Sequence, residues 1–312
     1  MTLPPIDSSG GKPEESSFVD RHHIHPIVFA ALSLFVVFVL YQLVAGTVTF
    51  FIVGSSTVTR ENVTEIRLLT MAGQLICILL PTLFLARLLS TRISSVFGWR
   101  IPSVAETIYA ILGLFFLQQI FQIYLFFQDL IPLPDAVRNI LDPFKKMIEE
   151  MFRALVQVES LPELFFVVLV VAFVPAIVEE LLFRGLIQKS LEKSLPGIQA
   201  AVLAGTIFGL YHFNPFAVIP LVGLGCYFGF LRFRSESIVI AMTAHFVNNA
   251  LATIAVYFQM ESEMIIGAKE AADQDIGAVV IQLFLYSSLF LLAFFAYLRS
   301  TVHLSGKTHD QV

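Results

Sequence analysis

Two adjacent carboxylates lie within a long apolar stretch of this 312-residue sequence, at Glu179 and Glu180, and Arg184 follows four residues later. Glu180 and Arg184 share one face of a helix and can pair, whereas Glu179 points about 100° away around the axis. Two carboxylates this close in a dry setting are expected to have different pKa values, which suits one of them to general-base chemistry. The structural alternative is an interfacial Glu–Arg pair that only ends an apolar helix.

Two histidines follow on later apolar stretches, in Phe208-Gly-Leu-Tyr-His212 and in His245-Phe-Val-Asn-Asn249. His245 and Asn249 are four residues apart, so both can direct hydrogen-bond donors into one cavity. Taken singly, His212 fits a structural histidine near a helix end, and His245 with Asn249 fits a polar contact between membrane helices. Ionisable groups inside membrane helices are costly, however, and together these residues indicate where a function is to be expected.

These groups are expected to be carried by membrane helices. Hydrophobic residues make up 57% of the chain and charged residues 14%, whereas soluble domains have about 45–50% and about 25%. A soluble fold of this length could not bury that much apolar surface. We therefore expect an all-α, polytopic membrane helix bundle surrounded by lipid. The net charge of −5 and the lack of a basic cluster argue against a nucleic-acid partner.

About 20 apolar residues in a helix cross a bilayer, and several stretches approach that length. We predict about eight transmembrane helices, at 27–53, 66–89, 104–128, 161–190, 198–213, 216–233, 237–258 and 276–298. The fifth and sixth are short and are separated by Asn214-Pro215, where proline should interrupt a helix. Lys and Arg are more frequent in the loops on the side of the N-terminus, which favours two cytoplasmic termini. The expected location is a plasma or inner membrane.

The sequence divides into four parts. Residues 1–25 are rich in Pro, Ser, Gly and charge and are expected to form a disordered cytoplasmic tail. Residues 26–160 hold the first three transmembrane helices and an amphipathic connector, 161–258 the helical core with the polar residues, and 259–312 the last transmembrane helix and the C-terminal tail. Within the connector, apolar residues recur every three or four positions over 137–158, which predicts an amphipathic helix along the membrane surface or over the bundle.

A predicted turn at Pro196-Gly197 sets the relative heights of the candidate groups. Glu179 and His212 are nearly equidistant from this turn along the chain, so two antiparallel helices would place them at nearly the same height. His245 reaches that height only if the hairpin protrudes from the end of the bundle.

In this order, the segments resemble the signature of the family named for CAAX prenyl proteases and bacteriocin-processing enzymes, abbreviated CPBP and also described as Abi-like. The family pattern is Glu-Glu-x-x-x-Arg, then Phe-x-x-x-His, then His-x-x-x-Asn on successive membrane helices, and every position is filled within residues 161–258. Phe97-Gly-Trp-Arg100 is loosely similar to the family as well. The resemblance implies an intramembrane endopeptidase, a hydrolase acting on a peptide or on a membrane-associated or prenylated protein.

For such an enzyme we predict hydrolysis by a glutamate-activated water. Glu179 is expected to act as the general base, and His212 to share the water and direct it. His245 and Asn249 are expected to donate hydrogen bonds to the oxyanion, which is usually the largest contribution to such catalysis.

Arg184 is expected to keep Glu180 ionised and in place, and this mechanism requires no cofactor. The same side chains also allow a metalloenzyme, in which Glu179, His212 and His245 would be three zinc ligands and water would take the fourth position. No His-Glu-x-x-His helix, the usual metallopeptidase motif, is present. The metal-free mechanism is the one we favour.

Two other functions fit the same residues. A non-catalytic immunity or peptide-binding membrane protein would keep this fold and bind a peptide without cleaving it. A transporter or proton relay would also use Glu and His within helices. Transporters often contain inverted repeats, and none is visible in this sequence.

Overall fold

The computed structural model describes residues 16–55, 58–258 and 275–302. Within these ranges the chain is helical apart from short connections, and the only β-like feature is an isolated bridge between Trp99 and Ser237. The predicted all-α, polytopic membrane helix bundle is therefore confirmed. The ends of both expected tails and most of the loop before the last helix lie outside the described residues.

Six helical segments of the described chain are long and apolar enough to cross a membrane. They are Pro26–Val53 (α2, η1 and α3), Val63–Leu89 (α4, η2 and α5), Val104–Asp129 (α7), Leu161–Glu192 (α9, η3, α10, η4 and α11), Ile238–Tyr257 (α14) and Ile276–Ser300 (α16). The η segments are π-helical turns inside otherwise α-helical spans.

The other two predicted spans are also helices, but neither meets the same measure of length and apolarity. α12 (Gly197–Leu210) is apolar but has only 14 residues. α13 (Val218–Ser235) has 18 residues and carries Arg232 and Arg234 in its last turn. Six spans are thus shown by length and composition, and the count of eight remains a prediction.

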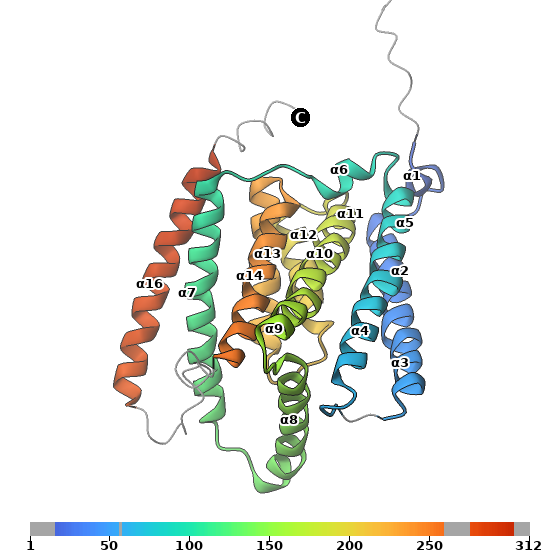
Figure 1. Ribbon diagram of the computed structural model, residues 1–312. Helices are drawn as coiled ribbons and strands as arrows, with labels where there is room; N and C mark the ends of the chain where they lie inside the picture. Colours follow the sequence, from blue (N-terminus) through green and yellow to red (C-terminus); the bar gives the residue numbers. More distant parts are fainter. Residues whose placement is uncertain (1–15, 56–57, 259–274, 303–312) are drawn as a thin grey trace, which may run out of the picture.

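The helices form three groups side by side (Figure 1). α2–α5 lie on the right of the view, α7 and α16 on the left, and α9–α14 between them. α1 and the C-terminal end of α16 lie at the same, upper end of the bundle. The candidate residues of the sequence all belong to the central group, which therefore has protein on both sides.

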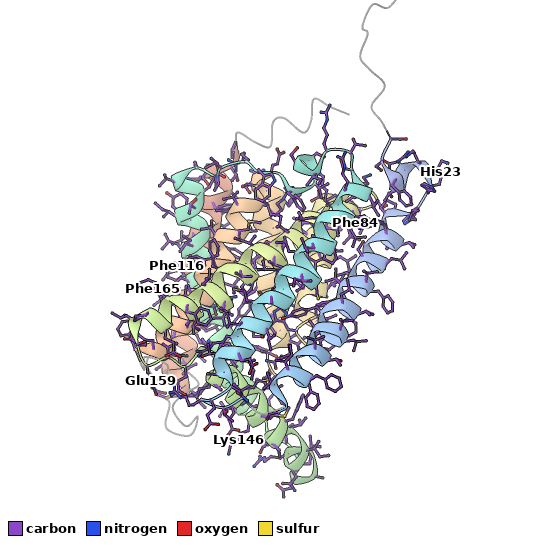
Figure 2. The ribbon with its side chains drawn as sticks, turned by 45° about the vertical axis from the view of Figure 1, so that its right-hand side comes forward. His23, Phe84, Phe116, Lys146, Glu159 and Phe165 are labelled. Carbon is purple, nitrogen blue, oxygen red and sulfur yellow. The ribbon has the colours of Figure 1, made fainter. Side chains whose placement is uncertain are left out.

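Large aromatic side chains cover the outside of the bundle between its ends (Figure 2). Phe84 and Phe165 are 65% and 75% exposed, and Figure 2 places them at intermediate heights, with Lys146 and Glu159 nearer the lower end. An exposed apolar belt with charged residues beyond it is the surface that a bilayer requires.

Residues 16–25 contain a short helix in a stretch whose composition predicts disorder. Within residues 16–25, a serine-capped turn forms α1 (Phe18–Arg21). Val19 is buried, and the Asp20 carboxylate pairs with Lys193 over 3.2 Å. One buried apolar side chain, a cap and an ion pair are enough to order this segment. The structure therefore describes a helical turn within the expected tail, and residues 1–15 of that tail lie outside the described residues.

The predicted amphipathic connector is α8 (Asp135–Val156), which lies at the lower end of the bundle (Figure 1). Its C-terminal end is held by Arg67, whose buried guanidinium donates to the carbonyl oxygens of Leu155 and Gln157 over 2.9 and 2.7 Å. Ile140 remains 73% exposed. An amphipathic helix with exposed apolar residues, placed at this end, fits the membrane surface.

The segment Phe97–Arg100 ties together the upper end of the bundle. The chain turns at Gly98, which has a φ of +64°. Arg100 Nε then donates to the carbonyl oxygen of Ser235 over 2.7 Å, and the guanidinium pairs with buried Glu106 of α7. The family-like Phe-Gly-Trp-Arg sequence thus joins α7 to the turn between α13 and α14.

Glycines bring α12 and α13 into close contact. A Cβ atom on Gly205 would overlap the backbone nitrogen of Cys226, and one on Gly225 would overlap the carbonyl oxygen of Gly205. Small residues four apart let membrane helices approach closely. The sequence contains this spacing on both helices, at Gly205 and Gly209 and at Gly225 and Gly229.

Candidate active site

Glu180, Arg184 and His245 form a buried, hydrogen-bonded group. Arg184 Nη1 donates to Glu180 Oε1 over 2.7 Å, and His245 Nδ1 lies 2.9 Å from the same oxygen. The side chains of Glu180 and Arg184 are 0% exposed, and that of His245 is 5% exposed. Because an ionised carboxylate only accepts, His245 Nδ1 carries the hydrogen. The other ring nitrogen, Nε2, is then left for a different partner.

The group is assembled from two membrane helices. Glu180 ends α10 (Val174–Glu180), and Arg184 lies in the π-helical turn η4 (Leu181–Ile187). His245 comes from α14, one span further along the chain. π-helical turns are rare and occur often at functional sites. The pairing of Glu180 with Arg184 follows their helical spacing, whereas the contact with His245 was not predicted.

Arg184 is stabilised by the close packing of α12 and α13. Its Nη2 donates to the carbonyl oxygen of Gly225 over 2.9 Å. The guanidinium also lies over the rings of Phe208 and Phe228, at 4.4 and 5.4 Å from their centroids. A buried ion pair is tolerated only when further partners offset its desolvation, and a carbonyl and two aromatic faces supply them here.

His212 follows the last turn of α12 and is exposed. Its Nδ1 lies 2.8 Å from the carbonyl oxygen of Phe208. The Phe208 ring contacts both imidazoles, with centroid distances of 4.7 Å to His212 and 5.8 Å to His245. The two histidines that are far apart in the sequence therefore meet at one aromatic ring.

Glu179 is half-buried, and it takes part in no hydrogen bond or ion pair of the described residues. Tyr41 and Arg184 are close enough to interact with its charge. The two adjacent carboxylates thus have different surroundings: Glu180 is paired and fully buried, while the Glu179 carboxylate remains available to a water or a substrate.

Asn249 lies one helical turn after His245 on α14. Its Nδ2 donates to the carbonyl oxygen of Val171 over 3.2 Å, and its Oδ1 accepts from Asn248 Nδ2 over 3.0 Å. Val171 belongs to η3 (Leu169–Phe173), on the same span as the carboxylates. The amide therefore also joins the carboxylate-bearing span to the histidine-bearing one.

The zinc alternative requires Glu179, His212 and His245 to converge. Over the described part of the chain, no three His, Cys, Asp or Glu side chains lie together as a possible metal site. Glu180 and His245 are in contact, but the third charged group beside them is the cation of Arg184. In this arrangement the residues do not fit a zinc ion.

The polar group is closed on one side and open on the other. The residues of η4 are all buried, whereas Phe213, beside His212, is 61% exposed. The loop that follows His212 contacts α8, because the rings of Phe216 and Phe144 lie 5.8 Å apart. The exposed His212 side of the group therefore lies near the end of the bundle that carries α8.

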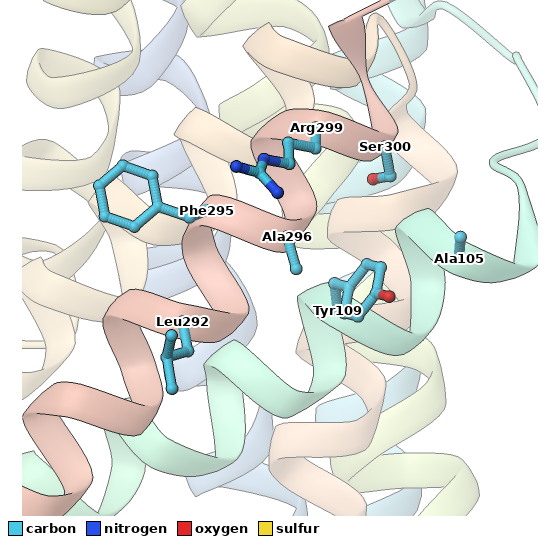
Figure 3. Close-up of a pocket in the computed structure, with 7 residues that line it drawn as sticks. All are labelled: Ala105, Tyr109, Leu292, Phe295, Ala296, Arg299 and Ser300. Carbon is cyan, nitrogen blue, oxygen red and sulfur yellow. The ribbon is translucent and has the colours of Figure 1, made fainter.

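A groove of about 670 Å³ lies elsewhere, between α7 and α16 (Figure 3). Seven residues line it, namely Ala105, Tyr109, Leu292, Phe295, Ala296, Arg299 and Ser300. None of the candidate residues takes part. The groove opens at the periphery of the bundle, away from the polar group.

Ionisable groups held inside a multi-pass helical bundle define the broad class as a membrane protein with a polar site among its helices. Within that class, residues 161–251 match the family model described as type II CAAX prenyl endopeptidase, Rce1-like. The matched segment contains all the candidate residues, and the resemblance to CAAX proteases is confirmed. The match supports a membrane endopeptidase with a peptide or protein substrate. The comparisons with curated proteins and with solved structures gave no match.

Proposed function

We propose that this protein is an intramembrane endopeptidase that hydrolyses a peptide bond of a membrane-associated or prenylated protein with a water activated by Glu179. The observation that supports this most is the buried group of Glu180, Arg184 and His245. A catalytic site needs side chains held in place before the substrate arrives, and this ionic group holds one imidazole in a defined orientation.

Glu179 is the proposed general base. Its carboxylate has no hydrogen-bonding partner in the described chain, and exposed His212 lies on the open side of the site. The carboxylate would remove a proton from water as the water oxygen attacks the scissile carbonyl carbon. The same proton would then pass to the leaving nitrogen as the C–N bond breaks. His212 would hold and direct the water.

His245 and Asn249 are the proposed oxyanion donors. His245 donates its Nδ1 hydrogen to Glu180 Oε1, and in the doubly protonated ring Nε2–H can donate to the oxyanion as well. The Asn249 amide has two N–H groups, and one of them is donated to Val171. The second is available to the substrate. Removing one such donor typically lowers kcat by about 10²–10³-fold.

We propose that the reaction uses no metal. This is supported by the cation of Arg184, which already neutralises the carboxylate that contacts His245. Activity should then persist in the presence of a strong zinc chelator, and the purified protein should contain zinc well below one equivalent. Loss of activity on chelation that returns when zinc is added would overturn this part of the proposal.

The decisive experiment is the Glu179→Gln variant in reconstituted membranes. Cleavage of membrane-associated peptides should be abolished while expression and folding are retained, because the amide cannot take a proton from water. Glu65→Gln is the matched control, since Glu65 is exposed at the start of α4. Comparison of cellular proteomes with either variant would identify the substrates. A Glu179→Gln protein that still performs its cellular role would favour a non-catalytic peptide-binding protein.

We also propose that both termini are cytoplasmic, in a plasma or inner membrane. Both ends of the described chain lie at one end of the bundle (Figure 1), and the Lys/Arg bias of the loops favours the cytoplasm for that end. The end that carries α8 would then face the opposite side. A single cysteine placed in α8, in a variant without Cys77 and Cys226, should react with an impermeant maleimide in intact cells. Protection of that cysteine would reverse the orientation.

A further inference from the structure

A chain of three side-chain amides runs across the bundle to the candidate oxyanion donor. Gln118 Nε2, in the middle of α7, donates to Asn248 Oδ1 on α14. Asn248 Nδ2 donates to Asn249 Oδ1 over 3.0 Å, and Asn249 Nδ2 donates to the Val171 carbonyl oxygen over 3.2 Å. Three separate helical spans are joined by these hydrogen bonds. Neither Gln118 nor Asn248 belongs to the motifs that identify the site.

The hydrogen bonds give this series of three side-chain amides a direction, from donor to acceptor. An amide side chain has one acceptor oxygen and one NH₂ group, and its orientation is decided by its partners. The Oδ1 of Asn249 accepts from Asn248, and its Nδ2 donates to Val171. The oxygen and the nitrogen of the Asn249 amide therefore cannot exchange places without breaking both bonds. Gln118 fixes Asn248 in the same way, since its NH₂ group requires the Asn248 oxygen.

This direction decides what Asn249 presents to the site. Its face of α14 is the one that carries His245, one turn earlier. With Oδ1 turned to Asn248, the nitrogen lies towards the carboxylate-bearing span, and its second N–H remains for a ligand. A flipped amide would present an oxygen instead and would repel an oxyanion.

We infer that Gln118 and Asn248 are positioning residues of the reaction, which hold the Asn249 amide with its N–H towards the oxyanion. The inference rests on the proposed function. The simpler alternative is that the contacts of Gln118 and Asn248 only stabilise the association of the helices, as polar residues do in membrane bundles. The two roles differ in what they change: positioning acts on the chemical step through Asn249, whereas association acts on stability.

The test compares Gln118→Leu with Gln119→Leu in the full-length protein, reconstituted and supplied with a cleavable membrane peptide. Gln119 is the next residue of α7, is comparably half-buried, and makes no hydrogen bond within the described residues. Gln118→Leu should lower kcat by about tenfold or more with little change in KM, because misorientation of a donor affects the transition state. Gln119→Leu should stay within about twofold of the parent.

A double variant separates positioning from stability. Adding Gln118→Leu to Asn249→Ala should reduce kcat by no more than about twofold further, since the group to be positioned has already been removed. Full additivity of the two losses would overturn the inference, as would an unchanged kcat in Gln118→Leu. If Gln118→Leu does not fold, Asn248→Ala breaks the same chain one step later and must show the same non-additivity. If Glu179→Gln retains activity, the proposed function fails independently of these results.

Discussion

Two arginines are completely buried in this membrane protein, and their surroundings differ. Arg67 donates to three acceptors: two carbonyl oxygens of the α8–α9 connection and, over 2.8 Å, the Glu163 carboxylate. Arg184 shares a single carboxylate oxygen with His245, while Glu180 Oε2 and Arg184 Nε have no partner among the described residues. Buried polar atoms are normally paired, and unpaired ones require an explanation.

The difference distinguishes a structural ion pair from the pair that we propose is functional. The hydrogen bonds of Arg67 all end on the backbone or on one carboxylate, so the group has no capacity for a ligand. Arg184 also donates to one backbone carbonyl, that of Gly225, but its other bond leads through Glu180 to an imidazole with one free nitrogen. A buried charge alone therefore does not identify an active site. What distinguishes a candidate site is that polar atoms near the buried charge remain available to a ligand.

Among changes to the two arginine pairs, the largest expected effect comes from Glu180→Gln. The amide keeps the shape of the carboxylate but removes its charge, so the orientation and protonation of His245 are no longer secured. We expect kcat to fall by about 10³-fold or more, as for other carboxylates that orient a catalytic imidazole. Glu163→Gln, the same change beside Arg67, should leave kcat within about tenfold. Comparable losses in both variants would remove the distinction between the two arginines.

The next largest effect is on stability. Arg67→Met removes three hydrogen bonds and leaves two carbonyl oxygens and a carboxylate without this donor. Breaking a buried pair by removing one partner costs about 3–5 kcal/mol, so thermal unfolding in detergent should shift strongly to lower temperature. At temperatures where the variant is still folded, its KM for peptide should match that of the parent. A stable Arg67→Met protein would show that this pair is not a structural clamp.

A smaller effect is expected from Gly225→Ala. The added methyl group would overlap the backbone of Gly205 and push α12 and α13 apart, which would displace the Gly225 carbonyl that binds Arg184. Overpacking of this kind costs about 1–3 kcal/mol, and kcat should fall because Arg184 loses a partner. Gly46→Ala is the control, since nothing lies within 4 Å of a Cβ at Gly46. Equal behaviour of the two variants, in unfolding and in kcat, would contradict the packing argument.

The smallest effect is expected at the exposed ion pair of Asp20 with Lys193. The Ser17 hydroxyl, which donates to the carboxylate, and the Lys193 ammonium lower the pKa of Asp20. A carboxyl with a lowered pKa in the folded protein stabilises it above the unfolded pKa and loses that contribution as the pH falls through the folded pKa. An exposed pair contributes less than about 1 kcal/mol.

Asp20→Asn should therefore flatten the acid limb of the stability profile slightly and leave kcat unchanged. Thermal unfolding of both proteins between neutral and acidic pH would measure this. A large loss of stability at neutral pH would mean that α1 contributes more to the bundle than one exposed ion pair.

The positions of the helices could largely be predicted because hydropathy is a local property. The last span was expected at 276–298 and occurs at Ile276–Ser300, and the connector expected at 137–158 occurs at Asp135–Val156. The fifth helix ends earlier than expected, at Leu210 rather than at residue 213. Phe213 has a φ of +51°, and no pattern of apolar residues reports such a backbone change.

Local patterns in the sequence were enough to predict the class of the protein and to single out the residues that we propose carry its chemistry. Apolar length requires membrane helices, because an unpaired backbone is too costly in lipid, and ionisable residues within those helices are costly enough to mark a site. Spacing of four residues also placed Glu180 with Arg184 and His245 with Asn249 on common helix faces.

Which of these helix faces meet could not be predicted and became known from the packed helices. Glu180 contacts His245, the Arg184 guanidinium lies between Phe208 and a carbonyl of α13, and Gln118 reaches Asn248. Each contact depends on how closely two helices pack and how each is rotated about its axis. Those quantities depend on small residues and π-helical turns spread along several spans, so they are properties of the assembled bundle and cannot be obtained from one segment at a time.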